Sequence, residues 1–180
     1  MSTPKALVLR AAGTNCDREA KFALEQAGFA AERVHVFRIM ENPAKLAEYQ
    51  FLVIPGGFSY GDDVAAGKIL ANQMIHRLAE PLNRFVADGK LVLGICNGFQ
   101  VLVKAGLLPN LFGNFQTIEA TLTLNDSAKF EDRWVYLKGP GSRVQGPGKT
   151  KCVWTKGINR VIKLPVAHGE GKFIPRTDKI

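Results

Sequence analysis

The amino-acid sequence predicts an α/β fold, in which a doubly wound, mostly parallel sheet has helices on both faces. Short apolar runs at 6–9, 51–54 and 91–95 have the length of buried strands. Segments with apolar residues at helical spacing separate these runs, and such alternation is typical of parallel sheets. After Leu108, polar and apolar residues alternate, which predicts a half-exposed antiparallel extension in the C-terminal third.

The expected elements of the first half follow one another with short turns between them. They are a strand, a helix, a strand, a short helix, a strand and a long helix, at 6–9, 19–27, 31–39, 42–49, 51–54 and 64–88. Capping residues such as Asp17 open the first helix, and Gly28 ends it. We expect the long helix to be interrupted near Pro81, because proline removes a backbone donor.

The second half is expected to consist of strands and one loop. The strands are predicted at 114–124, 133–137, 151–155 and 161–167, and the loop, rich in Gly and Pro, at 139–148. Neither a repeat nor a linker is evident, so the sequence predicts one domain over residues 1–180.

The composition excludes several classes of protein. All of the net charge of +8 lies in residues 138–180, where ten Lys or Arg face two acidic residues. Few aromatic residues accompany these charges, so we expect a solvated or partner-facing surface and no nucleic-acid site. No apolar run approaches the ~20 residues that span a bilayer, and the N-terminus lacks a signal peptide. The three cysteines are too widely spaced for a disulfide framework, which suits a reducing compartment. We therefore expect a cytoplasmic protein, and no membrane partner.

One strand-to-helix turn gives the strongest functional signal. The apolar run ends at Gly94, Cys96 and Gly98, where the apolar spacing changes from continuous to helical. Small neighbours permit the strained backbone that a sharp turn needs at its apex. Cys96 is therefore expected to stand exposed at a helix N-terminus, where the helix dipole favours a thiolate. We interpret it as a nucleophile and not as a small core residue.

A second turn, with two adjacent glycines, follows the strand at 51–54. Backbone amides at Gly56 and Gly57 can point into the space beyond the strand and bind an oxyanion. Both turns end strands of one sheet, so we expect them to share a site. Ser59 either lines that pocket or only caps the loop. The loop with Cys16 is interpreted as an ordinary capped turn, and Cys16 is expected to be inert.

Several motifs together resemble one enzyme family. They are Gly13-Thr14-Asn15-Cys16-Asp17, residues 55–62, residues 94–100, Gly106-Leu107-Leu108-Pro109 and residues 165–171. In this order, over nearly the whole chain, they are similar to the glutamine amidotransferase subunits of phosphoribosylformylglycinamidine synthase, which are class I glutamine amidotransferases. The resemblance implies a flavodoxin-like sheet and the hydrolysis of glutamine. It also implies that ammonia passes to a synthetase subunit, which uses ATP to amidate formylglycinamide ribonucleotide in purine synthesis.

The chemistry of this reaction fits the residues. Cys96 would attack the carboxamide of glutamine and form a glutamyl thioester, which water then hydrolyses. The backbone amides of Gly57 and Asn97 are the expected oxyanion donors, with Gly56 beside them, and Gln100 is a weaker pocket or partner candidate.

No cofactor is expected in this chain, because nothing matches a P-loop and the histidines and cysteines lack metal-ligand spacing. ATP and Mg²⁺ are expected on the synthetase subunit, and a small third subunit is a further candidate partner.

One family feature is absent from the sequence. The family completes its catalytic triad with a His-Pro-Glu segment, whose histidine acts as the base and whose glutamate orients it. No such segment occurs here, so we expect that the C-terminal part of the family domain is missing. His168 and Glu170 have the same spacing and would share one face of an extended strand. They match a different family motif, so they are candidates for pocket or partner contacts, and His168 is also a candidate base.

Three functions remain open from the sequence. The first is a glutaminase subunit, and the second is a catalytically incomplete binding or structural subunit of the same complex. The third is a protein of the related superfamily of chaperones and deglycases, which also places a cysteine on such a turn. That group has a glutamate near the cysteine, whereas the first loop here offers Asn15 and Asp17.

Overall fold

The structure, a computed structural model, describes residues 2–111, 113, 117–138, 153–154, 158 and 160–176. Two compact units are present, Met1–Thr123 with Glu170–Ile180, and Leu124–Gly169. The single domain expected from the sequence stays a prediction. The expected loop at 139–148 and Cys152 lie outside the described residues.

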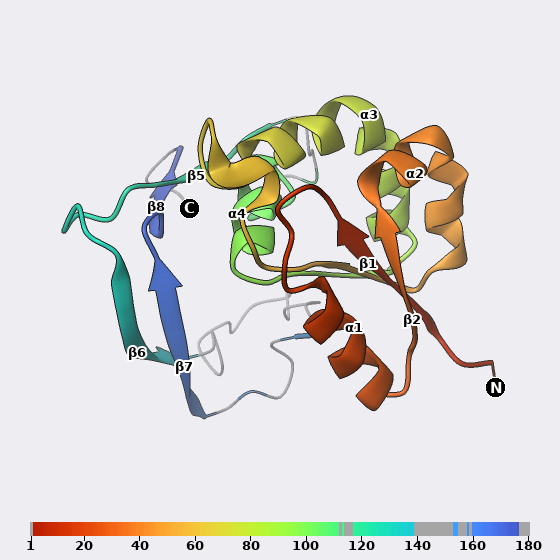
Figure 1. Ribbon diagram of the computed structural model, residues 1–180, viewed down its shortest axis with the longest axis horizontal. Helices are drawn as coiled ribbons and strands as arrows, with labels where there is room; N and C mark the ends of the chain where they lie inside the picture. Colours follow the sequence, from red (N-terminus) through yellow and green to blue (C-terminus); the bar gives the residue numbers. More distant parts are fainter. Residues whose placement is uncertain are drawn as a thin grey trace. The chain divides into compact units, whose positions relative to one another are not determined.

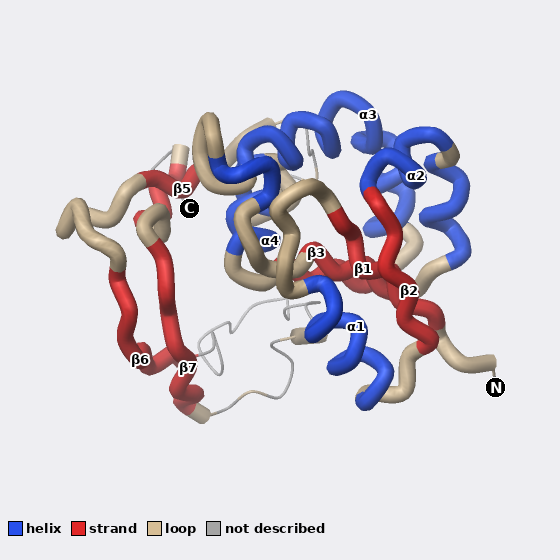
Figure 2. The backbone as a smooth tube through the Cα atoms, in the orientation of Figure 1, coloured by secondary structure: helices blue, strands red, loops and turns tan. Residues whose placement is uncertain are grey.

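A parallel sheet of four strands forms the centre of the first unit (Figures 1 and 2). Its order is β2-β1-β3-β4, and the strands are β1 (Lys5–Arg10), β2 (Ala30–His35), β3 (Phe51–Ile54) and β4 (Leu91–Gly94). The first strand thus lies between the second and the third, so the strand order reverses beside β1. This is the arrangement of doubly wound folds, in which ligands bind at the carboxyl ends of the strands.

Helices cover both faces of this sheet, as the sequence predicts. They are α1 (Asp17–Gln26), α2 (Val36–Glu41), α3 (Lys68–Ala87) and α4 (Asn97–Lys104), with 3₁₀ turns η1 (Pro43–Glu48) and η2 (Ser59–Asp62). Alternate strand residues enter separate apolar clusters: Leu7 packs with residues of α3 and α4, whereas Val8 packs with Leu24 of α1. Figure 1 accordingly shows α1 on one side of the sheet and α3 on the other. The α/β fold class is confirmed.

Antiparallel strand pairs form the predicted extension in the C-terminal third. In the first unit, β5 (Ala120–Thr123) pairs with β8 (Lys172–Pro175). In the second unit, β6 (Glu131–Lys138) pairs with β7 (Val161–His168). Within the strand expected at 151–155, residues 153–154 form a turn, and the others lie outside the described residues.

Two expected elements of the first half of the chain differ from the structure. The second strand ends at His35, because the next six residues form α2; the His35 ring accepts a hydrogen bond from the Phe37 amide, 3.3 Å away, and caps this helix. Helix α3 begins at Lys68 and continues through Pro81 without the expected interruption. Leu78 and Leu82, one turn apart on either side of that proline, are both buried, so packing against the sheet holds the helix together.

Among the described residues, no helix combines the length and the apolar character that crossing a membrane requires.

A buried tyrosine links β2 to the segment before β3. The Tyr49 hydroxyl donates a hydrogen bond to the Glu32 carboxylate, and this bond lowers the pKa of Glu32. Burial, followed by the same hydrogen bond, raises the pKa of Tyr49 above its usual range. Because the folded-state pKa of Glu32 lies below its unfolded value, its contribution to stability is present at neutral pH and is lost on acidification.

We predict that Tyr49→Phe lowers the free energy of unfolding by about 1 kcal/mol at neutral pH, since the bond is partly exposed on the Glu32 side. The difference from the unaltered chain should shrink as the pH falls below 4.5, the ordinary pKa of Glu32. Urea unfolding at pH 7 and at about pH 3.5 measures both effects. Tyr136→Phe is the matched control, because Tyr136 is exposed. A loss that is independent of pH would contradict the assignment.

Candidate active site

The turn between β4 and α4 has the strained geometry that the sequence predicts. Cys96 is exposed and has φ 52° and ψ −111°, a backbone conformation that residues with a side chain rarely adopt. A Cβ on Gly98 would lie 1.8 Å from the carbonyl oxygen of Ile54, and one on Gly94 would lie 2.6 Å from the carbonyl oxygen of Gly98. Both glycines are therefore required for α4 to begin so close to β3.

The glycine turn after β3 meets the first loop of the chain. Gly57 has φ +130° and forms an isolated bridge with Thr14, and the Phe58 amide donates to the carbonyl oxygen of Gly13 at 3.0 Å. A Cβ on Gly57 would lie 2.7 Å from the Asn15 nitrogen, so only glycine fits. The carboxyl ends of β1 and β3 are thus joined directly.

Gly56 lies between two cysteines. A Cβ built on it would be 3.4 Å from the Cβ of Cys96 and 3.7 Å from the Sγ of Cys16. The structure therefore brings the two predicted turns together, as expected, and it adds Cys16 to the same place. This neighbour could not be inferred from local sequence, because β1 and β4 lie far apart along the chain.

The thiol of Cys16 differs from a reactive one. It donates a hydrogen bond to the Asn15 side chain, 3.3 Å away. Burial and the nearby charges of Glu19, Cys96 and Asp17 raise the pKa of Cys16 above its ordinary value. The thiol is therefore protonated at neutral pH, which argues against Cys16 as the nucleophile.

The buried side chain of Asn97 forms hydrogen bonds that connect α4 to the segment after the glycine turn. Its side chain is 3% exposed and accepts a hydrogen bond from the Ser59 amide at 3.1 Å. It also donates to the carboxylate of Asp62 and to the side chain of Gln100, each at 3.1 Å. Sequence reasoning gave Asn97 a role through its backbone and missed Asp62, since nothing local indicates that this carboxylate reaches α4.

Glu170 belongs to the same polar cluster. Its carboxylate lies 2.9 Å from the ammonium of Lys104 and accepts from the Ala66 amide at 3.3 Å. Its backbone carbonyl accepts from the Gln100 side chain at 2.9 Å. Gln100 and Glu170, two of the weaker pocket or partner candidates, are thus in contact. Lys104, which the sequence did not single out, belongs to the same cluster.

His168 lies in the second unit, at the end of β7. Its Nδ1 atom is 3.0 Å from the side-chain oxygen of Asn125. Because β7 ends at His168 and Glu170 follows in a bend, the expectation that both side chains share one strand face is wrong. The role of His168 as a base stays a prediction.

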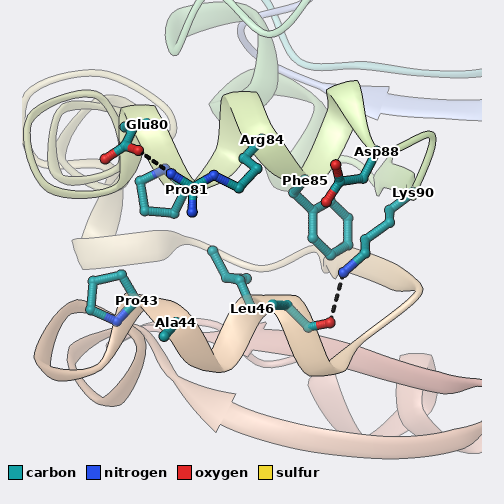
Figure 3. A pocket seen from close by; sticks show the side chains of 10 residues that line it. Pro43, Ala44, Leu46, Glu80, Pro81, Arg84, Phe85, Asp88 and Lys90 are labelled. Carbon is teal, nitrogen blue, oxygen red and sulfur yellow. Dashed lines mark hydrogen bonds and ion pairs between the residues drawn. The ribbon is translucent and has the colours of Figure 1, made fainter.

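A cavity of about 220 Å³ lies elsewhere in the first unit (Figure 3). It is lined by residues of η1 and of the end of α3, among them Leu46 and Phe85, and by Lys90. Lys90 precedes β4, whereas Cys96 follows it, so the cavity is at the amino end of the strand and the cysteine beyond its carboxyl end. The ammonium of Lys90 donates to the Ala47 carbonyl oxygen at 2.7 Å, and Arg84 pairs with Glu80. This cavity is therefore separate from the turn of Cys96.

In the described part of the chain, no three His, Cys, Asp or Glu side chains are grouped as a metal ion would require.

Comparison with known proteins points to one family. The model of the CobB/CobQ-like glutamine amidotransferase domain matches residues 3–180. A phosphoribosylformylglycinamidine synthase subunit PurQ from Dehalococcoides mccartyi is 50% identical, over 97% of this chain and 64% of the relative. The subunit of the same name from Treponema denticola is 42% identical, over 98% of this chain and 66% of the relative. The chain thus spans less than two thirds of the length of these curated relatives.

A solved structure is also similar to this chain in sequence and in fold. The structure of PurLQS from Thermotoga maritima includes a chain that is 32% identical and superposes with a TM-score of 0.71, over 98% of this chain and 72% of that chain.

We predict that Gly56→Ala blocks the thiol of Cys96 without unfolding the chain. The added methyl group would make only ordinary contacts, at 3.4 Å or more, but it would stand between the two cysteines. Alkylation of Cys96 by iodoacetamide, followed by peptide mass spectrometry, should slow about tenfold, while the melting temperature changes by only a few degrees. Gly169→Ala is the matched control, since among the described residues, apart from its two chain neighbours, no atom lies within 4 Å of its Cβ position. Equal alkylation rates in both variants would contradict this geometry.

We predict that Ser59→Ala leaves stability unchanged or slightly raised. Ser59 is 2% exposed, and its hydroxyl oxygen has no hydrogen-bond partner among the described residues. Removing a buried polar atom that has no partner should change the free energy of unfolding by less than about 0.5 kcal/mol. Urea unfolding measures this, and a loss of several times that size would show that the hydroxyl is satisfied.

Proposed function

Because the chain belongs to the CobB/CobQ-like glutamine amidotransferase domain family, we propose that it supplies the glutamine-hydrolysing site of a phosphoribosylformylglycinamidine synthase. The observation that carries this proposal is the strained turn of Cys96, with the glycine turn of β3 directly against it. The relatives named PurQ support this particular synthase.

The proposed reaction begins at the thiolate of Cys96, which attacks the carbonyl carbon of the glutamine side chain. A C–S bond forms, and the carbonyl oxygen gains the negative charge of a tetrahedral intermediate. The amide of Asn97, in the first turn of α4, has no partner within the helix, and together with the Gly57 amide it can donate to this oxyanion. The N-terminus of α4 also stabilises the thiolate, because Cys96 is its N-cap residue.

Collapse of the intermediate breaks the C–N bond, and ammonia leaves with a proton from a general acid. Water then attacks the thioester, which releases glutamate and regenerates the thiolate. The reaction thus needs a group that moves protons between the thiol, the leaving amine and water. His168, the candidate base from the sequence, belongs to the second unit, so its part in this step stays a prediction.

The proposed partner is a synthetase subunit that consumes the ammonia and holds ATP and Mg²⁺, with a small third subunit as a further candidate. Large apolar side chains are exposed beside the nucleophile, namely Ile95 at 46% and Phe99 at 39%. Phe58, which follows the glycine turn, is 62% exposed. A protein that covers these side chains would also keep ammonia from escaping to water. We place this complex in the cytoplasm, since both described cysteines are free thiols.

The chaperone and deglycase alternative receives no support from the first loop. The Asp17 carboxylate lies 2.6 Å from Arg10 and 3.1 Å from Arg33, and Asp17 is only 5% exposed. The Asp17 carboxylate is thus paired with two guanidinium groups, so it is not available for the role that the glutamate has in that superfamily. No specific observation favours the catalytically incomplete subunit.

We predict that Cys96→Ser lowers glutamate release from glutamine by at least about a thousandfold, because the nucleophile is lost. The full chain is assayed together with its synthetase subunit, and a reactive glutamine analogue is used to label the cysteine. Cys16→Ser is the matched control and should keep both activity and labelling. Labelling that persists in Cys96→Ser, or a control that is equally inactive, would overturn the assignment.

A further inference from the structure

Helix α4 carries a polar stripe on the face below the nucleophile. Asn97, Gln100 and Lys104 are three and four residues apart, so their side chains lie on one side of the helix. Asn97 is 3% exposed and Lys104 is 5% exposed. Burial of an ammonium group is costly unless a carboxylate and further hydrogen bonds accompany it, so this stripe requires a partner.

Glu170 is that partner, and it also reaches a second element. Its carboxylate is 2.9 Å from the Lys104 ammonium and accepts a hydrogen bond from the amide of Ala66 at 3.3 Å. The backbone carbonyl of Glu170 accepts from Gln100 at 2.9 Å. Glu170 therefore bridges α4 to the loop that runs from the glycine turn of β3 to α3, residues 58–67, which we name the 58–67 loop.

The 58–67 loop contains backbone strain that other contacts must offset. Tyr60 and Asp62 both have φ 56°, in the left-handed region that residues with a side chain rarely adopt. Side chains fix three backbone amides of this loop: Asn97 accepts from Ser59, Asp62 from Gly67, and Glu170 from Ala66. Helix α4 thus holds one end of the loop through Asn97 and the other end through the Lys104–Glu170 pair.

This arrangement connects the two halves of the catalytic machinery. Cys96 precedes α4 directly, and Gly57 precedes the 58–67 loop directly. We propose that Lys104 and Glu170 are positioning residues, whose partly buried ion pair clamps this loop to α4 and so fixes the Gly57 amide relative to the Cys96 thiolate. The inference deepens the proposed function and depends on it for its catalytic part. The clamp itself follows from the contacts alone.

The test uses the full chain, with its synthetase subunit for activity measurements. In Lys104→Met and Glu170→Ala, hydrogen exchange of amides in the 58–67 loop should become at least about tenfold faster. The kcat for glutamine hydrolysis should fall about a hundredfold with KM within about threefold, since misplacement by a fraction of an ångström impairs chemistry more than binding. Glu170→Gln keeps one acceptor oxygen for Ala66 and Lys104 but removes the charge beside the Lys104 ammonium, so both exchange and kcat should lie between those of Glu170→Ala and the unaltered chain.

Arg84→Met provides the matched control, since it breaks an exposed ion pair on α3 and should alter neither readout. Unchanged exchange of the 58–67 loop in Lys104→Met and Glu170→Ala would overturn the clamp. So would a fall in kcat that Arg84→Met shares, or one that Glu170→Gln fails to relieve while it remains folded. If the unaltered chain hydrolyses no glutamine, the proposed function fails, and the exchange measurement still decides whether the clamp exists.

Discussion

The contact between the first turn of α4 and the end of β3 is the constraint on which the site depends. A Cβ on Gly98 would lie only 1.8 Å from the Ile54 carbonyl oxygen, so helix and strand touch through their backbones. This contact brings the start of α4 beside the glycine turn that follows β3. Without it, the amides of Asn97 and Gly57 could not serve the one oxyanion of the proposed reaction, and the strained conformation of Cys96 would not be needed.

Much of the fold could be predicted because its signals are local. Apolar runs mark β1, β3 and β4, and glycines on both sides of Cys96 mark the turn that follows β4. Helix α2 was missed, since a short run of apolar residues has the same local pattern in a strand and in a helix. What decides between them is the cap that His35 supplies and the burial of Ile39 against the sheet, and both are tertiary features.

The site was predicted less completely than the fold, for a related reason. The motifs placed Cys96, Gly56 and Gly57, each of which stands next to the strand that positions it. Lys104 and Glu170 are 66 positions apart, and nothing in either local sequence says that they meet. The nearness of Cys16 was hidden in the same way. Contacts between distant segments depend on strand order and helix packing, which a single sequence specifies only through the whole fold.

The two cysteines at Gly56 are chemically distinct because their surroundings differ. Cys16 lies near the acidic residues Asp17 and Glu19, which together with burial disfavour its thiolate. Cys96 is instead the N-cap of α4, where helix dipoles and unpaired amides favour negative charge. Gly56 therefore lies between a thiol whose pKa is raised and a cysteine that begins a helix. Exposure does not distinguish the two residues, since both are exposed, so the proposal of Cys96 as the nucleophile rests on its position at the start of α4.

In the first unit, the residues that stabilise the fold differ from those that determine the positions of the proposed reactive groups. The apolar residues on the two faces of the sheet supply the driving force for folding, and packing of this kind tolerates small shifts. In the proposed function the reactive groups are fixed instead by a partly buried polar cluster of Asn97, Asp62 and the Lys104–Glu170 pair. Hydrogen bonds between charged groups are satisfied only over a narrow range of distance and angle, so this cluster tolerates far less displacement. The strain at Tyr60 and Asp62 can persist because this cluster holds the amides of Ser59, Ala66 and Gly67 in the same loop.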